Sequence, residues 1–358
     1  MPNSFSVRSL FREYSVEFID NLKQRIRSLV DKGHFFVIDA GVYDLYQDCF
    51  KTVVSKDALF IEEAIEKAKT FENSYSLIKR LMASGVRKNT TLVAVGGGVI
   101  QDLTAFVSSI LFRGIEWMFF PTTLLAQADS CIGSKTSINM EGYKNILGNF
   151  YPPSKIFIDL KFLESLNDGD IKSGIGEMMH FYFVAGSPYA EKIATHYQEL
   201  FAGREWFGEY IDASLAIKKD VIERDEFDKG ERNLFNYGHT FGHAIETITD
   251  YKVPHGQAVT LGMDIANYIS LQRGMIDLEI FGRMRQILMN NLPKLEISDE
   301  QMDRYMDALS KDKKNTNQGL TCILTEGPGR MKRVCIPMDE PLRNMIGSCV
   351  NHYAVNRS

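Results

Sequence analysis

Residues 90–102 read Thr90-Thr-Leu-Val-Ala-Val-Gly-Gly-Gly-Val-Ile-Gln-Asp102, and this stretch decides the fold of the first half of the chain. The apolar run Thr90–Val95 predicts a strand buried on both faces, as the strands of a parallel sheet are. Three glycines follow directly, and residues 99–110 then carry apolar side chains with helical spacing. This order brings backbone N–H groups close to a phosphate at a helix N-terminus. The glycines do not form the GxGxxG dinucleotide fingerprint, so a tight turn that only needs glycine explains them equally well.

The neighbouring segments repeat this alternation of strands and helices. Apolar runs predict further strands at residues 35–39, 117–120 and 156–160. Residues 59–85 predict one helix, with a polar face of Glu62, Glu63, Glu66, Lys67 and Lys69 and an apolar face of Leu77 and Leu81. Strands that alternate with helices indicate a parallel α/β sheet.

The pattern becomes helical beyond residue 160. Helices are predicted at residues 162–166, 170–185, 189–200, 210–224, 233–246, 257–274 and 278–290. A β-like segment follows at residues 320–324, and residues 334–336 look like the end of a strand. A chain of 358 residues is too long for one ordinary core. We therefore predict an α/β domain over residues 1–160 and a mostly α-helical domain over residues 161–358.

The composition is that of a soluble globular protein, with 44% hydrophobic and 24% charged residues. A net charge of −5 argues against a general nucleic-acid binder. Residues 1–6 lack the pattern of a signal peptide, and we expect no membrane-spanning segment because no apolar run is long enough. The cysteines are odd in number and contain no CxxC pair, which predicts reduced thiols in a cytoplasmic protein.

Residues 233–246 contain the most informative polar pattern of the second half. His239 and His243 are four residues apart, so both imidazoles lie on one face of the predicted helix. His255 follows after a short interval. Imidazole is the commonest metal ligand, and a carboxylate is a usual third partner in an open catalytic site. A buried histidine with a chance neighbour would explain a lone HxxxH, but the third histidine favours a metal site.

Glu177 lies in the middle of an apolar helix, Gly174-Ile-Gly-Glu-Met-Met-His-Phe-Tyr-Phe183. A buried carboxylate needs a partner because an unpaired buried charge is very costly. A metal ion shared with the histidines would supply one. A salt bridge to a lysine or arginine would do so equally well.

Residues 129–145 form a polar stretch that includes Asp129, Lys135, Lys144 and Asn145. An acid, two lysines and an asparagine among small residues can hold a phosphate or a polyol, with lysine as the point charge. Taken alone, such a stretch is more often a solvated loop.

Several of these motifs together resemble 3-dehydroquinate synthase, of the sugar-phosphate cyclase superfamily. They are Gly96-Gly-Gly-Val-Ile-Gln-Asp102, Pro121-Thr-Thr-Leu-Leu-Ala126, Asp129-Ser-x-x-Gly-x-Lys135-Thr136, Lys144-Asn145, Gly176-Glu177, Arg232-Asn-Leu-x-Asn236-x-Gly-His239-Thr-Phe-Gly-His243-Ala-Ile-Glu, His255-Gly and Asp312-Lys-Lys-Asn315. The motifs follow the family's order across most of the chain, from about residue 60 to about residue 325. Their joint occurrence is far more specific than any one of them.

The resemblance implies an NAD-binding α/β domain, a mostly helical metal-binding domain and a homodimer. It implies Glu177, His239 and His255 as ligands of a divalent metal, zinc or cobalt. His243 would then support the ligands or transfer a proton. Residues implied at the NAD site are Gly96, Gly97, Gly98, Asp102, Thr122, Thr123, Asp129, Lys135, Lys144, Glu66 and Lys69. Residues implied around a sugar-acid phosphate substrate are Lys135, Asp129, Lys144, Asn145, Lys218, Arg232, Asn236, His180, one of Lys313 and Lys314, and Arg113 reaching the neighbouring subunit's site.

The chemistry implied is redox-neutral, with NAD as a catalytic cofactor. The family's substrate is 3-deoxy-arabino-heptulosonate 7-phosphate. A hydride is removed from one carbon, phosphate is eliminated, the hydride is returned, and an aldol reaction closes a carbocycle. In this scheme the metal acts as a Lewis acid on adjacent sugar hydroxyls.

His180 is the main departure from the family's pattern, which has lysine at this position. Histidine is shorter and is often neutral at pH 7, so it does not reproduce a lysine's contact with substrate oxygens. Smaller departures are Ser134, Gln257 and Asp228. They raise the hypothesis that the reaction type is kept while the substrate is altered, for instance an amino-substituted or epimeric ulosonate phosphate in secondary metabolism.

Three other functions fit parts of the sequence. A cyclase acting on a sugar phosphate without a carboxylate is disfavoured by Lys218 and Arg232, because unpaired cations in a pocket are costly. A metal-dependent polyol dehydrogenase would share a Gly-Gly-Gly turn but not the motif around Lys135. A catalytically inactive scaffold is disfavoured because all three proposed metal ligands are present.

Overall fold

The computed structural model describes residues 4–141, 143–204, 206–311 and 319–355. The chain divides into two compact units. The N-terminal unit comprises Met1–Leu166, Arg204–Leu215 and Ile222–Glu226. The C-terminal unit comprises the segments Asn167–Gly203, Ala216–Val221 and Phe227–Ser358. Helix α9 (Phe207–Arg224) therefore contributes residues to both units.

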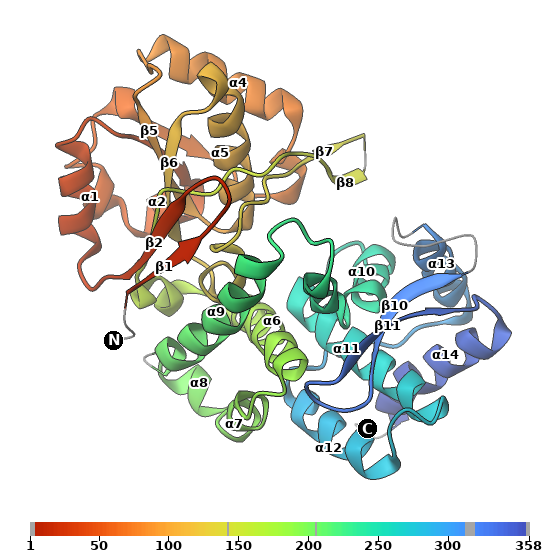
Figure 1. The fold of residues 1–358 in the computed structure, drawn as a ribbon. Helices are drawn as coiled ribbons and strands as arrows, with labels where there is room; N and C mark the ends of the chain where they lie inside the picture. The colour runs from red at the N-terminus through yellow and green to blue at the C-terminus, as the bar shows by residue number, and fades with distance from the viewer. Residues whose placement is uncertain (1–3, 142, 205, 312–318, 356–358) are drawn as a thin grey trace. The chain divides into compact units, whose positions relative to one another are not determined.

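A twisted sheet forms the centre of the N-terminal unit (Figure 1). Its strands are β1 (Phe5–Arg8), β2 (Glu13–Phe18), β3 (Phe35–Asp39), β4 (Leu59–Glu62), β5 (Thr91–Gly96), β6 (Glu116–Pro121) and β9 (Lys155–Ile158). They lie in the order β1-β2-β9-β6-β5-β3-β4, and all neighbours are parallel except the β1–β2 hairpin. The strands predicted from apolar runs are thus confirmed, and the sheet is parallel where they lie.

Helices cover both faces of this sheet. They are α1 (Leu22–Val30), α2 (Ala40–Leu45), α3 (Gln47–Phe50), α4 (Phe71–Ala83) and α5 (Gly98–Ile110). Val93 and Val95 of β5 point to the face covered by α1, where they join one buried cluster. Figure 1 shows α1 and α5 on opposite sides of β5 and β6. Because successive strand residues face opposite ways, a strand covered on both sides is apolar throughout, as β5 is.

The single helix predicted over residues 59–85 is wrong in its first half. Leu59–Glu62 is the edge strand β4, which pairs in parallel with β3. A short 3₁₀ turn at Glu66–Ala68 follows, and the helix α4 begins only at Phe71. Burial of Phe60 in the sheet overrides the helical preference of the alanines and charged residues that follow it. The predicted apolar face is correct within α4, where Leu77 and Leu81 are fully buried.

The predicted polar stretch 129–145 contains elements that periodicity did not reveal. Ala126–Ser130 is a short π-helical turn that carries Asp129. Strands β7 (Ile138–Met140) and β8 (Tyr143–Leu147) pair antiparallel as a separate ribbon. Most of this stretch therefore has regular secondary structure and is not an irregular loop.

Helices form most of the C-terminal unit. They are α6 (Asp168–Ala185), α7 (Tyr189–Thr195), α8 (Glu199–Ala202), α10 (His239–Ile248), α11 (His255–Gln272), α12 (Leu278–Leu288), α13 (Asp299–Ser310) and α14 (Glu340–Val355). One hairpin accompanies them, β10 (Leu320–Thr325) with β11 (Met331–Ile336). The helix predicted over 189–200 is interrupted between Thr195 and Glu199, so that prediction was too long. Helix α14 lies in a region where the sequence pattern predicts no element.

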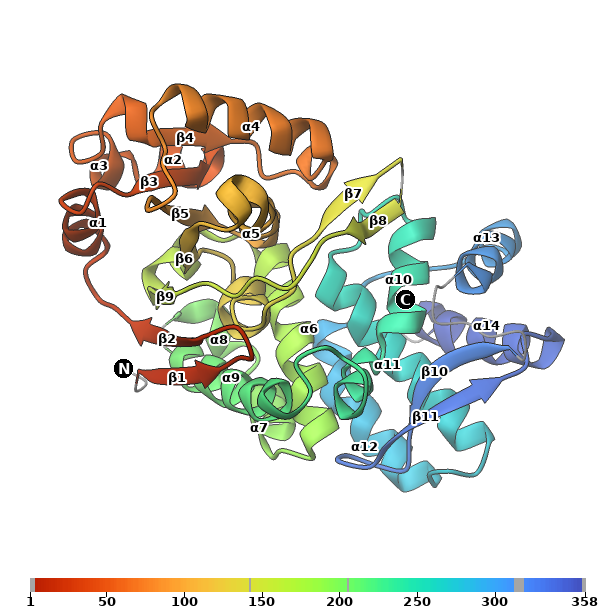
Figure 2. The same ribbon diagram turned by 45° about the horizontal axis from the view of Figure 1, so that its top comes forward.

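Helices α6, α10 and α11 lie side by side in the C-terminal unit (Figure 2). Helices α6 and α11 approach so closely at Gly176 and Gly256 that neither position has room for a side chain. A Cβ atom on Gly176 would lie 2.0 Å from the carbonyl oxygen of Gly256, and one on Gly256 would lie 1.8 Å from that of Ser173. The Ser173 hydroxyl accepts a hydrogen bond from the Gly256 amide at 3.0 Å. This contact brings residue 177 of one helix next to residue 255 of the other.

All five cysteines are free thiols. Among the described residues, no helix is both long enough and apolar enough to cross a lipid bilayer.

Candidate metal and cofactor sites

Three predicted metal ligands converge in the C-terminal unit. Glu177 lies in the middle of α6, while His239 and His255 are the first residues of α10 and α11. Their donor atoms lie within 4.8 Å of one another. The Glu177 Oε1 atom is 3.0 Å from His255 Nε2 and 3.5 Å from His239 Nε2. The structure therefore gathers one carboxylate and two imidazoles that are far apart in the sequence.

The local backbone explains where His239 lies. Gly238 has φ of +80° and directly precedes α10. A side chain there would be strained, and its Cβ would lie 2.6 Å from Met263 and 2.8 Å from the Val259 carbonyl oxygen. Glycine thus lets α10 start against α11, with His239 in its first turn.

Both imidazoles are held so that Nε2 faces Glu177. His239 Nδ1 lies 3.3 Å from the Tyr237 carbonyl oxygen. His255 Nδ1 lies 3.0 Å from Oε2 of Glu246, a residue of α10. With the proton on Nδ1 in each ring, each Nε2 offers a lone pair to the same point.

Burial and the neighbouring charges act in opposite directions on the pKa values of Glu177 and His255. Burial opposes ionisation of Glu177, but His239 and His255 beside it hold the pKa of its carboxyl well below the usual range. Burial likewise opposes a charge on His255, but its contacts with Glu177 and Glu246 hold the pKa of that imidazole well above its ordinary value.

The donor set fits a divalent metal ion. One carboxylate and two imidazoles are the protein ligands of an open catalytic zinc site, which keeps a position for water or substrate. Glu177 is 2% exposed, and its Oε1 accepts no well-aligned hydrogen bond. A buried oxygen without such a partner is costly unless another group, such as a cation, compensates it.

His180 lies on the other side of Glu177. Its Nδ1 is 3.8 Å from Glu177 Oε2, and its ring packs against Phe181 and Phe235. The ring is 1% exposed, and neither nitrogen has a well-formed hydrogen bond. Burial and the neighbouring His239 lower the pKa of His180 to about 3, so it is neutral at pH 7. The lysine that the resemblance implied at this position is therefore replaced by an uncharged ring.

The other predicted site residues of the C-terminal unit differ in how far they are buried. His243 is exposed, and its ring stacks on His255 with centroids 5.7 Å apart. Lys218 on α9 and Arg232, in the 3₁₀ turn before α10, are both buried. Asn236 donates a hydrogen bond to the Asn233 carbonyl oxygen at 2.9 Å. Lys313 and Lys314 lie outside the described residues.

The predicted dinucleotide turn lies in the N-terminal unit at the carboxyl end of β5. Gly97 caps the N-terminus of α5, and Gly96 accepts a hydrogen bond from the Thr122 amide at 3.0 Å. A Cβ atom on Gly97 would lie 3.0 Å from Thr123, whereas one on Gly98 would meet nothing within 4 Å. The turn therefore leaves open space beside the first N–H groups of a helix, which fits a phosphate.

Four of the residues implied by resemblance form one network beside this turn. Lys69 Nζ lies 3.0 Å from Asp102 Oδ2, 2.6 Å from Asn145 Oδ1 and 3.4 Å from Glu66 Oε1. Burial raises the pKa of Asp102, and Lys69 opposes this shift. The Ser137 hydroxyl lies within hydrogen-bond distance of both acceptors, 3.0 Å from Asp102 Oδ2 and 2.8 Å from Asn145 Oδ1. Through these contacts, Lys69 and Ser137 connect Asn145 of the β7–β8 ribbon with Asp102 near the start of α5.

Other predicted residues of the N-terminal unit are more exposed. Lys135 and Lys144 are exposed, and Asp129 is partly buried. Arg113 is exposed in a turn where Phe112 and Arg113 both have positive φ, 51° and 63°. Two consecutive non-glycine residues in this conformation are unusual and mark a locally strained turn.

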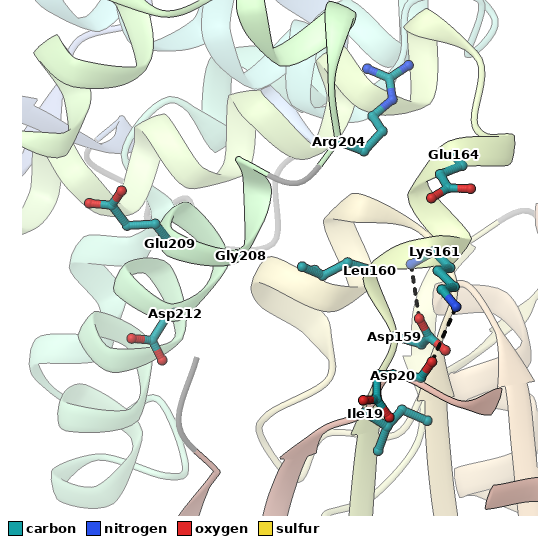
Figure 3. A pocket seen from close by; sticks show the side chains of 10 residues that line it. All are labelled: Ile19, Asp20, Asp159, Leu160, Lys161, Glu164, Arg204, Gly208, Glu209 and Asp212. Atoms are coloured by element: carbon teal, nitrogen blue, oxygen red, sulfur yellow. Dashed lines mark hydrogen bonds between the residues drawn. The ribbon is translucent and has the colours of Figure 1, made fainter. Parts of the chain in front are cut away.

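A separate cavity of about 680 Å³ opens in the N-terminal unit (Figure 3). It lies at the carboxyl ends of β2 and β9 and is lined by Asp20, Asp159, Lys161, Glu164, Glu209 and Asp212, among others. It contains none of the predicted site residues. Its acids outnumber its cations, so it is poorly suited to a phosphate group.

Sequence reasoning did not single out Glu246, Ser137 or Asn139. Asn139 donates a hydrogen bond to Glu66 Oε1 at 2.8 Å and accepts one from the Asn145 amide at 2.9 Å. The spacing of Glu246 could have indicated that it lies near the metal ligands. It comes seven residues after His239 and is therefore on the same face of the helix. Ser137 and Asn139 are ordinary polar residues whose partners only the folded chain identifies.

Comparison with known proteins finds family matches over residues 59–315. Residues 59–173 match the family described as 3-dehydroquinate synthase N-terminal, and residues 174–315 match 3-dehydroquinate synthase C-terminal. The 3-dehydroquinate synthase of Streptococcus pyogenes serotype M3 is 31% identical over 338 residues, covering 92% of this chain and 94% of that protein.

Two solved structures have a similar fold. A 2-deoxy-scyllo-inosose synthase complexed with carbaglucose-6-phosphate, NAD+ and Co2+ has a TM-score of 0.83 at 23% identity, covering 97% of this chain and 100% of that one. The 2-epi-5-epi-valiolone synthase of Streptomyces hygroscopicus subsp. jinggangensis, with NAD+ and Zn2+ bound, has a TM-score of 0.81 at 24% identity, covering 98% and 99%. From the family matches and the bacterial relative, we conclude that this chain belongs to the 3-dehydroquinate synthase family.

Proposed function

We propose that this protein is an NAD- and metal-dependent sugar-phosphate cyclase that converts a heptulosonate 7-phosphate into dehydroquinate and phosphate. The observation that carries the proposal is the convergence of Glu177, His239 and His255 on one point. The relatives named 3-dehydroquinate synthase support the reaction, and the fold neighbours solved with NAD+ and Co2+ or Zn2+ support the cofactors.

In this proposal the C-terminal unit binds the metal and the N-terminal unit binds NAD. Glu177, His239 and His255 would hold the metal, and Gly96, Gly97 and Gly98 would admit the NAD pyrophosphate. When bound, NAD would accept and return one hydride, and the metal would acidify a sugar hydroxyl. The net reaction needs no external oxidant because the hydride that leaves the substrate returns to it.

The cationic residues would bind the anionic substrate. Lys218 and Arg232 are buried, so each provides a positive charge with little screening by water. We assign them to the substrate carboxylate, and Lys135, Lys144, Asn145 and Asn236 to its phosphate and hydroxyl groups. Asp129 and His243 would orient the reacting groups or move protons.

Arg113 supports a homodimer in this proposal. It is exposed, in a turn where both Phe112 and Arg113 have positive φ. We propose that it completes the phosphate site of a second copy. Mixing inactive Arg113→Ala and Glu177→Gln proteins tests this, because a mixed dimer would contain one intact site. Recovered activity would support the exchange, and persistent inactivity of a demonstrated mixed dimer would contradict it.

The test of the reaction is phosphate release from heptulosonate 7-phosphate with catalytic NAD and added zinc or cobalt. Rapid release without accumulation of NADH, and dehydroquinate as the product, would support the proposal. Stoichiometric NADH without phosphate would instead indicate a polyol dehydrogenase.

His180 favours a second candidate, a cyclase for a modified ulosonate phosphate such as an amino-substituted or epimeric one. Its ring is buried and neutral where the family has a cation. A substrate that carries its own amine, or lacks the group a lysine would contact, loses nothing at this position. Turnover of an amino-substituted substrate with no turnover of the unmodified one would establish this candidate.

A further inference from the structure

Two possible metal-binding groups in the C-terminal unit share one histidine. The first is Glu177, His239 and His255, and the second is His243, Glu246 and His255. A neutral imidazole has one lone pair and one N–H, so His255 can serve as a ligand on only one side. If the ion binds at one group, the other group must have a different role.

The geometry favours the first group as the ligands. Its carboxylate, Glu177, has an oxygen without a well-aligned hydrogen bond, and the residue is almost wholly buried. That oxygen lies 3.0 and 3.5 Å from the Nε2 atoms of both histidines of its group, so the three donors already face one point. In the second group, Glu246 Oε2 lies 3.0 Å from His255 Nδ1. His243, the third member of that group, is exposed.

We propose that Glu246 is a positioning residue: it accepts the Nδ1–H of His255, fixes the tautomer whose Nε2 lone pair faces Glu177, and itself binds no ion. Helix α10 then provides a metal ligand at one end, His239, and the support for a second ligand two turns later. The inference rests on the proposed metal site but is independent of the substrate.

The two ligand histidines are supported unequally. His239 Nδ1 faces a backbone carbonyl at 3.3 Å, whereas His255 Nδ1 faces a carboxylate at 3.0 Å. A carboxylate makes the opposite nitrogen a stronger donor than a neutral carbonyl does. His255 also lies at the N-terminus of α11, where the helix dipole disfavours positive charge, and Glu246 offsets this effect.

The test measures Zn2+ and Co2+ affinity of the full-length, metal-stripped protein by competition with a chromophoric chelator. Glu246→Ala should weaken binding about 10- to 100-fold, the usual effect of removing such a partner. Glu246→Gln keeps an acceptor for the N–H and should lose less. The control is Asp250→Asn, which removes a carboxylate just beyond α10 whose side chain is 74% exposed, and it should leave the affinity unchanged.

The absorption spectrum of bound Co2+ gives a second readout. Glu246→Ala should shift or weaken the visible bands because His255 rotates, and Glu246→Gln should retain them. Circular dichroism of the metal-free variants shows whether they are folded. If the alanine variant fails to fold, the affinity of the glutamine variant still tests the proposal. Loss of the carboxylate charge should weaken its metal binding measurably, whereas a merely structural Glu246 would leave that affinity unchanged.

Glu177→Gln and His243→Ala distinguish the two groups. Loss of tight binding in Glu177→Gln with retention in His243→Ala supports the assignment. Retention in Glu177→Gln with loss in both His243→Ala and Glu246→Ala would place the ion in the second group and overturn it. Unchanged affinity and spectrum in Glu246→Ala would also overturn it, without touching the proposed reaction, whereas a wild-type protein that binds neither ion would overturn both.

Discussion

His180 lies against Glu177, with its Nδ1 3.8 Å from Oε2 of that carboxylate, and is sealed from solvent by aromatic rings. The opposite oxygen, Oε1, faces the two other histidines. The carboxylate that we assign to the metal therefore has a neutral imidazole beside it, where the resemblance predicted a lysine.

Replacing His180 with lysine should increase turnover of the unmodified heptulosonate phosphate. A hydrogen bond to a charged group contributes roughly 1.5–3 kcal/mol, so restoring one should increase kcat/KM about tenfold or more. The measurement is kcat/KM for phosphate release, with His196→Lys on the surface as the control. A decrease in kcat/KM would show that His180 suits this substrate better than lysine does.

Gly256→Ala should destabilise the C-terminal unit. The new Cβ would lie 1.8 Å from the Ser173 carbonyl oxygen, so α6 and α11 must separate. Overpacking of this kind costs about 1–3 kcal/mol or more, and it should also weaken metal binding by moving His255 away from Glu177. Urea denaturation and chelator competition measure the two effects. Gly282→Ala in α12 is the control, because its Cβ would meet nothing within 4 Å and the change should be neutral or stabilising.

Lys69→Ala should destabilise the N-terminal unit. The substitution removes the cation that pairs with Asp102, a carboxylate that is already partly buried. Breaking a buried pair by removing one partner costs roughly 3–5 kcal/mol, and partial exposure of Asp102 places this case at the low end. The free energy of unfolding can be measured in urea. The exposed neighbour Lys67 serves as the control, since Lys67→Ala should change it by about 0.5 kcal/mol or less. Equal effects at both positions would contradict the network described here.

Removal of the bound metal should lower the thermal midpoint. A ligand that binds only the folded state at 100 times its dissociation constant stabilises it by about 2.7 kcal/mol. Scanning calorimetry of the chelator-treated protein, before and after addition of Zn2+, measures the shift. In Glu177→Gln the same addition should produce little shift, which separates specific binding from general effects of the ion.

Cys322 should resist alkylation in the folded protein. Burial raises the pKa of its thiol to about 12, so at pH 8 it holds less of the reactive thiolate than an ordinary cysteine. Because the folded pKa is the higher one, ionisation favours the unfolded state as the pH rises from about 9 to about 12. Peptide mass spectrometry after iodoacetamide treatment should find the exposed Cys335 modified first. Early labelling of Cys322 would show that β10 opens in the native state.

The sequence alone determined much of the architecture. Its apolar runs located β3, β5, β6 and β9, because a strand covered on both faces must be apolar throughout. Its helical periodicity located most of the second half. It failed at residues 59–70, where local charge and alanine content suggested a helix but pairing with β3 stabilises a strand. Pairing between distant segments contributes no local signal.

For the candidate site, too, the sequence determined one part and the tertiary structure another. The sequence supplied the ligand types, and resemblance selected Glu177, His239 and His255 from the available acids and histidines. Only the tertiary structure showed that Glu177 meets both histidines, because this depends on α6 and α11 touching at two glycines. It alone showed Glu246 behind His255 and His180 behind Glu177. Side chains that act together here come from three helices, and their distances depend on how those helices pack rather than on their separation along the chain.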